Sequence, residues 1–141
     1  MTLKVVPVDT THIQQVWPRV VDFIKSALDK GTTEETRNYN EHHIQQYLVS
    51  GQWLLLVAVD AENEIHGACT VSFISYPLHR VAFVTAIGGK LISSEDTFEQ
   101  LKNICKQHGA TKIQGYGREA IVKLWGRFGF EPRSTLVEFK L

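Results

Sequence analysis

The sequence has few cysteines and no excess of charge of either sign. Cys69 and Cys105 are the only cysteines among 141 residues, and neither belongs to a CxxC motif. This usage argues against a disulfide-stabilised secreted domain and is typical of a reducing compartment, so we expect two buried thiols. Fifteen Lys and Arg balance fifteen Asp and Glu, and a formal net charge of zero argues against capture of nucleic acid or of an anionic membrane by charge alone.

Long apolar runs and metal-ligand patterns are also missing. The longest apolar run, 53–59, is far too short to cross a bilayer, and the first residues, MTLKVVPVD, lack the apolar stretch of a signal peptide. We therefore expect a soluble, cytoplasmic protein. His42 and His43 are adjacent, so on a helix they point in different directions, and no second ligand pair has a usable spacing. We predict no metal site.

The sequence does contain enough apolar material for one folded domain. Hydrophobic residues make up 43% of the chain and charged residues 21%, so the chain can bury a core and is not a disordered segment. No repeat, low-complexity tract or linker divides it. We expect a single domain over residues 1–141.

The spacing of the apolar residues predicts alternating strands and helices. β-branched or alternating segments predict strands over 3–8, 53–59, 65–74, 80–87, 111–114 and 134–141. Helical spacing predicts helices over 13–28, 94–108 and 118–128. A further, more polar helix is predicted between the first two of these; it begins with the capping-box pattern 32–35 and ends before Gly51. Pro18 either kinks the first helix or occupies the first turn of a helix that begins later. The predicted order is βααβββαβαβ, an α/β fold with a mixed central sheet in which 80–87 and 111–114 are parallel.

This order, together with the segment HGATKIQGYGREAIVKLWGRFGFEP, resembles the GNAT superfamily of acetyl-CoA-dependent N-acetyltransferases. The shared features are a small residue after a helix, a short strand, a loop, and a helix that ends in Gly-Phe; here these are Gly109-Ala110, 111–114, 115–117 and Gly129-Phe130. The resemblance implies a GNAT-like fold, with an acetyl-CoA site where the strands 80–87 and 111–114 separate. Backbone N–H and C=O groups exposed there can pair with the amides of the pantetheine arm.

The sequence departs from this family at the loop that binds pyrophosphate. The family's pattern, Gln or Arg-x-x-Gly-x-Gly or Ala, should lie between residues 87 and 98, where only Gly88-Gly89 remains. Glu95 and Asp96 occupy the first turn of the next helix, where a carboxylate stabilises the helix but repels a diphosphate. The two glycines have a second interpretation, as a strand end that needs a positive φ angle. By the resemblance, the candidate cofactor-binding residues are Ile87, Gly88, Gly89 and Lys90.

The second departure concerns the tyrosine that often protonates the leaving thiolate in active members, in the pattern Tyr-x-x-x-Gly-Phe. Trp125 stands at that position, and an indole N–H cannot serve as a general acid. We predict that Trp125 is a packing residue of the last helix. The groups available to replace the tyrosine are Tyr116, His66, His79 and Tyr76. Tyr116 is our candidate catalytic residue, because it follows the strand 111–114 and lies between two glycines.

A further resemblance is to the GNAT-like proteins encoded by tailed bacteriophages, some of them among virion genes. The shared features are a Tyr-Pro turn, a Gly-Gly after the central strand and a Gly-Arg before the last helix, here Tyr76-Pro77, Gly88-Gly89 and Gly117-Arg118. Our first hypothesis is therefore a degenerate, phage-encoded protein that acts with other virion proteins, in the host cytoplasm or in the virion. The alternatives are an active N-acetyltransferase on an unknown amine or protein acceptor, with acetyl-CoA as cofactor, and an acyl-CoA binder without turnover.

Overall fold

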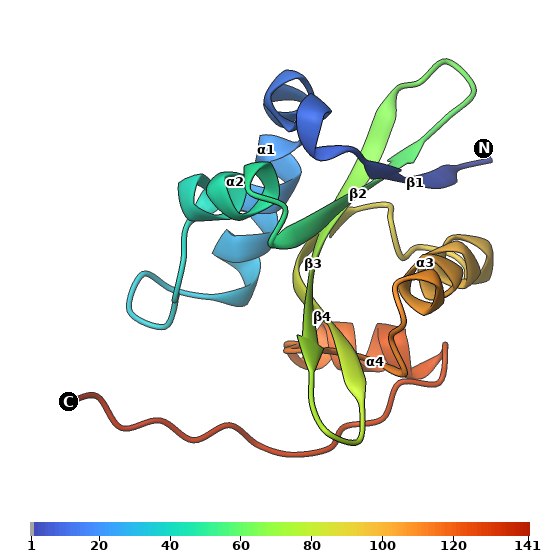
Figure 1. The fold of residues 1–141 in the computed structure, drawn as a ribbon. Helices are drawn as coiled ribbons and strands as arrows, with labels where there is room; N and C mark the ends of the chain where they lie inside the picture. The colour runs from blue at the N-terminus through green and yellow to red at the C-terminus, as the bar shows by residue number, and fades with distance from the viewer. Residues whose placement is uncertain (1) are drawn as a thin grey trace.

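The computed structural model describes residues 2–141 and contains one mixed five-stranded sheet (Figure 1). The strands lie side by side in chain order: β1 (Lys4–Val8), β2 (Trp53–Val59), β3 (Ile65–Ser75), β4 (Arg80–Gly89) and β5 (Lys112–Gly115). Neighbouring strands are antiparallel except β4 and β5, which are parallel as predicted. A parallel pair needs a crossover connection, and here the helix over Glu95–Gln107 lies in the connection between the two strands.

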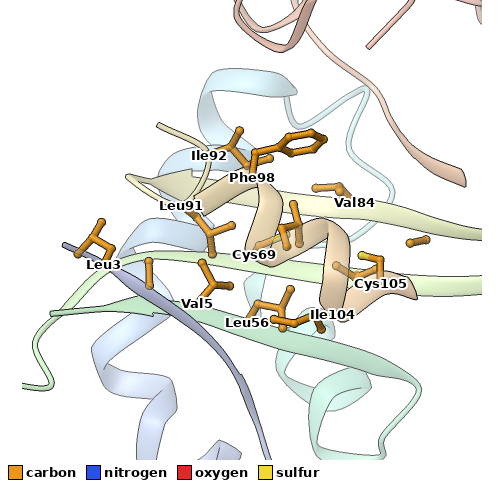
Figure 2. Close-up of a cluster of buried hydrophobic side chains, with 14 of the residues drawn as sticks. Leu3, Val5, Leu56, Cys69, Val84, Leu91, Ile92, Phe98, Ile104 and Cys105 are labelled. Carbon is orange, nitrogen blue, oxygen red and sulfur yellow. The ribbon is translucent and has the colours of Figure 1, made fainter. Parts of the chain in front are cut away.

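The helices cover both faces of the sheet, so the molecule has three layers. They are α1 (Ile13–Gly31), α2 (Glu41–Val49), α3 (Glu95–Gln107) and α4 (Glu119–Gly126). α1 and α2 pack on one face, in a core that includes Ile24 and Leu48. α3 and α4 pack on the other face, in the core around Leu56, Phe98 and Ile104 that Figure 2 shows. The α/β fold class and the mixed sheet are confirmed. Within residues 2–141, no helix combines the length and the apolar character needed to cross a bilayer.

A β-bulge in β4 changes which face its side chains cover. Thr70 of β3 pairs with Ala86, whereas Val71 pairs with Val84, so Thr85 is the extra residue. Before the bulge, Val84 lies in the core under α3; after it, Ala86 lies in the core under α1. An inserted residue reverses the alternation of a strand, so the two halves of β4 serve different cores.

Cys69 and Cys105 are both buried and free, as predicted. They lie in the same core, under α3, and Figure 2 shows them among its side chains. Burial raises the pKa of the Cys105 thiol to about 11 and raises that of Cys69 further. Both are therefore protonated, inert core residues at neutral pH.

The strand predicted over 134–141 is wrong for this structure. Residues 131–141 follow the last packed aromatic residue, Phe130, as an exposed segment without strand pairing. The alternation of Thr135, Val137 and Phe139 favours a strand, but a strand also needs a partner, and none in residues 2–141 is placed against it.

The predicted start of the second helix, at the capping-box pattern 32–35, is also wrong. The helix α2 begins at Glu41, where the side chain of Asn40 accepts hydrogen bonds from the N–H groups of His42 and His43. The capping-box pattern 32–35 forms a turn instead, closed by hydrogen bonds between Thr33 and Thr36. Serine and threonine hydroxyls stabilise such turns as well as helix ends, so the local pattern was ambiguous.

Pro18 lies inside α1, which runs from Ile13 to Gly31 without interruption. Its place in the second turn excludes the first-turn alternative considered from the sequence. The helix tolerates the missing proline N–H because its apolar stripe, including Trp17, Val20 and Ile24, is fully packed against the sheet.

Candidate active site where the strands part

The strands β4 and β5 pair over only part of β4. Val81 to Val84 lie opposite Lys112 to Gly115, and there β5 ends, while β4 continues through the bulge to Gly89. The chain then turns through Tyr116 and Gly117 into α4. We name the gap between 85–87 and 115–117 the strand opening. The bulge at Thr85 stands at the point where the pairing stops.

Tyr39 binds the bulged strand from the loop between α1 and α2. Its hydroxyl donates a hydrogen bond to the carbonyl oxygen of Thr85, with an Oη–O distance of 3.1 Å. The Thr85 hydroxyl in turn lies 2.7 Å from the Thr70 hydroxyl. The Tyr39 ring meets the edge of Trp53 at a centroid distance of 5.2 Å, and Trp53 stacks on Tyr47 at 4.5 Å. The loop is thus fixed to the strand opening by a hydrogen bond and an aromatic cluster.

Burial raises the pKa of Tyr39, and the phenol of Tyr116 raises it further. Tyr39 is therefore neutral throughout the physiological pH range. Because its proton points to the Thr85 carbonyl, the lone pairs of its oxygen are the free part of the group. Tyr39 can orient an amine by accepting a hydrogen bond, but it is not placed to give up a proton.

Tyr116, the candidate from the sequence, lies at the end of β5 between Gly115 and Gly117. The residue is 72% exposed, and its ring meets that of Phe83 edge-on at a centroid distance of 5.2 Å. Unlike Tyr39, Tyr116 has no hydrogen-bond partner for its hydroxyl within residues 2–141, so this proton is available.

The candidate cofactor residues Ile87 to Lys90 form the end of β4 and the residue after it. A Cβ on Gly88 would collide with the backbone of Phe23 in α1. Gly89 has a φ angle of +70°, and a Cβ there would collide with the His66 carbonyl. The N–H of Lys90 donates to that same carbonyl at 2.9 Å. Close packing and a positive φ therefore account for both glycines, and their part in binding a phosphate stays a prediction.

The first turn of α3 carries two carboxylates with different surroundings. Ser94 caps the helix by accepting from the N–H of Thr97, and Glu95 is exposed. Asp96 accepts a hydrogen bond of 3.0 Å from the amide of Gln100. That amide also donates to the Leu3 carbonyl, and its oxygen accepts from the Val5 N–H at 2.7 Å. Asp96 thus has a structural task, whereas Glu95 has none.

A shallow hollow of about 570 Å³ lies between the start of β1 and this helix turn. The residues lining it include one cation, Lys90, and one carboxylate, Asp96. A diphosphate here would meet one positive side chain, Lys90, and the Asp96 carboxylate, and Glu95 adds a second negative charge to the same helical turn. This loop is therefore a poor match for a diphosphate, and pairing of the strand opening with the amides of a pantetheine arm stays a prediction.

Trp125 is a packing residue, as predicted. It is buried in the core under α3 and α4, with its ring 5.1 Å from that of Phe130. It also packs beneath β5, where a Cβ on Gly115 would lie 3.4 Å from the indole. The indole therefore packs against the end of β5 that borders the strand opening.

The other polar candidates lie elsewhere. The His66 ring is 2.8 Å from Asp60 at the turn between β2 and β3, and the His79 ring is 2.9 Å from the Thr111 hydroxyl. Tyr76 is exposed at the turn between β3 and β4. Sequence reasoning missed Tyr39, because the residue was assigned to a helix and no motif marks it.

Comparisons with known proteins bear on the fold. No family model and no curated protein matches the chain. Among solved structures, a predicted acetyltransferase from Clostridium acetobutylicum with acetyl-CoA is 16% identical and has a TM-score of 0.67, covering 99% of this chain and 96% of its own. An aminoglycoside acetyltransferase from an uncultured soil metagenomic sample, HMB0005, is 14% identical with a TM-score of 0.70, covering 100% and 99%.

The chain has the GNAT acetyltransferase fold. A second soil metagenomic aminoglycoside acetyltransferase, meta-AAC0020 in complex with sisomicin, agrees with this: it is 11% identical with a TM-score of 0.69, covering 99% of this chain and 95% of its own. The GNAT resemblance of the sequence is thus confirmed at the level of fold. None of the comparisons points to a bacteriophage or a virion.

Proposed function

We propose that this GNAT-like chain is an acetyltransferase that acts on an amine at the strand opening, with acetyl-CoA as donor. The observation that carries the proposal is the Tyr39–Thr85 hydrogen bond, which fixes a polar acceptor group at the point where β4 and β5 part. The fold shared with acetyltransferases supports the same assignment.

The two phenols suit two different tasks in such a reaction. Acetyl-CoA supplies an activated acetyl thioester when it is bound. Tyr39 would accept a hydrogen bond from the incoming amine, since its own proton is engaged by the Thr85 carbonyl. As the C–N bond forms and the C–S bond breaks, Tyr116, whose hydroxyl is exposed at the end of β5, would donate its proton to the leaving sulfur. The proton that the attacking nitrogen loses would pass through solvent water and restore the Tyr116 hydroxyl. Backbone groups of β4 beyond the bulge would pair with the pantetheine amides.

The acids at the start of α3 favour a second candidate function without catalysis. Glu95 and Asp96 lie in the first turn of α3, directly after the loop to which the resemblance assigns pyrophosphate, and the glycines of that loop are explained by packing. A chain that binds acyl-CoA without turnover, or that serves only as an interaction component, would tolerate both features. The phage-encoded, virion-associated role belongs to this candidate and rests on the sequence resemblance alone.

One titration separates these possibilities. Acetyl-CoA is added to the full chain while the unfolding temperature is followed, because a ligand that binds the native state raises its stability. The released coenzyme A thiol is then measured with a panel of amines. Saturable stabilisation with thiol release supports the acetyltransferase, and stabilisation alone supports the acyl-CoA binder. If acetyl-CoA causes neither stabilisation nor thiol release, the proposed function is overturned and only the interaction component remains.

A further inference from the structure

A cavity of about 270 Å³ lies at the end of the sheet where β1 and β2 separate. Val8 ends β1 opposite Leu55, so Trp53 and Leu54, the first residues of β2, extend beyond β1 and line the cavity. We infer that this cavity, which we name the end cavity, binds a small aromatic carboxylate, with Arg80 as the residue that holds the carboxylate group.

The end cavity is separate from the strand opening. Arg80, which lines it, is the first residue of β4, whereas the strand opening begins at Thr85. Five residues of an extended strand span roughly 17 Å. A ligand in the end cavity therefore leaves the strand opening free, and its binding does not depend on the proposed acetyltransferase activity.

Apolar side chains from both cores form most of the cavity wall. Leu54 and Phe73 pack against the core under α3, and Trp53 packs against the core under α1, but all three are only partly buried. An apolar group in the cavity would cover the area that they still expose, which is favourable. The volume lies just below the range of roughly 300–1,000 Å³ that is usual for small-molecule pockets, so the occupant is the size of a single substituted ring.

The guanidinium group of Arg80 is held in place before any ligand arrives. Its Nε donates a hydrogen bond to the His108 carbonyl and its Nη1 donates to the Ser75 hydroxyl, both at 2.8 Å. Its Cζ lies 5.0 Å from the centroid of the Phe73 ring. Its stem lies over Gly109, where a Cβ would be 3.5 Å from the Arg80 Cδ. A group fixed in this way loses little freedom when it binds.

The positive charge of Arg80 has no carboxylate partner in the described chain. Its Nη2 donates no hydrogen bond to any of residues 2–141, and none of their ion pairs includes Arg80. No Asp or Glu is among the described residues that line the end cavity. One unpaired guanidinium in a mainly apolar cavity fits a single negative charge, and its planar N–H groups match a carboxylate.

Flat side chains beside Arg80 favour an aromatic ligand. The His108 ring stacks on Phe73 at a centroid distance of 5.1 Å with 12° between the ring planes. The Nδ1 of His108 donates to the Ile104 carbonyl at 3.0 Å, which fixes the ring. Both rings line the end cavity, as does Trp53. Aromatic groups pack well against one another in stacked or edge-on contacts, so a ring attached to the carboxylate suits this wall.

The test is a titration of the full chain with phenylacetate, followed by the chemical shifts of its backbone amides. Phenylacetamide has the same shape without the charge, and acetate has the charge without the ring. Phenylacetate should saturate a site that shifts the amides of 51–54, Arg80 and His108. Its Kd should be at least about tenfold lower than that of either comparison compound, the usual effect of a charge-assisted hydrogen bond or of a buried ring.

Arg80→Gln should abolish the preference for phenylacetate over phenylacetamide. The matched control is Lys112→Gln, which removes an exposed cation at the start of β5 that does not line the cavity. Arg80 also bonds Ser75 and His108, so a second variant tests the charge without disturbing them. Gln52→Glu adds a carboxylate to the exposed rim of the cavity and should weaken phenylacetate at least about twofold at low salt, with phenylacetamide unchanged.

Several results would overturn the inference. Phenylacetate that does not bind, or that binds no more tightly than phenylacetamide, would do so, as would a preference that a folded Arg80→Gln protein retains. If Arg80→Gln does not fold, an unchanged Kd for phenylacetate in Gln52→Glu is the contradicting result. Shifts confined to Tyr39, Thr85 and Tyr116 would also contradict it, because the acid would then occupy the strand opening.

Discussion

The hydroxyl of Tyr39 donates a hydrogen bond to the carbonyl of Thr85, the inserted residue of the bulge in β4. The bulge reverses the faces of β4 and stands where its pairing with β5 stops, so this one bond joins the loop before α2 to the strand opening. Tyr39 and the bulge at Thr85, which are far apart in the sequence, thereby form one site.

Tyr39→Phe keeps the ring that packs on Trp53 and removes only this bond. We expect the free energy of unfolding to fall by about 1 kcal/mol, because the Thr85 carbonyl loses its partner. If the protein is active, KM for the amine should rise more than kcat falls. Urea unfolding and initial-rate kinetics measure the two effects. Tyr47→Phe is the control, since Tyr47 contributes its ring to the same cluster. Equal losses in both variants would contradict the role given to the Tyr39 hydroxyl.

Glu95→Gln should strengthen binding of acetyl-CoA. It removes an exposed negative charge from the first turn of α3 and leaves the Asp96–Gln100 bond in place. A charge at a helix end contributes about 0.3–1 kcal/mol, which corresponds to a gain in affinity of roughly two- to fivefold at low salt. Calorimetric titration measures it, with Glu99→Gln one turn further along α3 as control. An unchanged or weaker affinity for Glu95→Gln would mean that the pyrophosphate does not approach this helix.

Trp125→Ala should lower the free energy of unfolding by about 3–5 kcal/mol, as is usual for deletion of a buried aromatic side chain. Val122→Ala on the same helix is the control and should cost about 0.5 kcal/mol or less, because Val122 is exposed. Denaturant unfolding compares the two. A Trp125→Ala protein of normal stability that had lost only its activity would show that the indole acts in the chemistry instead.

The thiols of Cys69 and Cys105 should be unreactive in the folded protein. With a pKa of about 11, Cys105 is roughly one part in a thousand thiolate at pH 8, and both thiols are also shielded by the core. An aromatic disulfide reagent should titrate both thiols in denaturant and neither on the same time scale under native conditions. Rapid labelling of one thiol in the native protein would show that the core under α3 opens.

The sequence carries most of the fold and little of the site, for identifiable reasons. The strand 53–59 is read correctly because a continuous apolar run between turn signals has few other solutions. The bulge at Thr85 cannot be read from VAFVTAIGG, because it arises from the pairing of β4 with β3. The proposed role of Tyr39 depends on its hydrogen bond to the carbonyl of the bulged residue Thr85, so it cannot be read from the sequence either. The alternation of 134–141 alone predicts a strand, but a strand forms only where a second segment pairs with it.

The release of coenzyme A thiol from acetyl-CoA, compared between the wild type and Tyr116→Phe with the same amine, tests the proposed acetyl transfer most directly. Tyr76→Phe is the control, since Tyr76 is an exposed tyrosine at the turn between β3 and β4. The proposal predicts saturable thiol release by the wild type and by Tyr76→Phe, and a rate about 100- to 10,000-fold lower for Tyr116→Phe, the usual worth of a positioned acid. Thiol release that survives Tyr116→Phe unchanged, or none from the wild type with any amine, would contradict it.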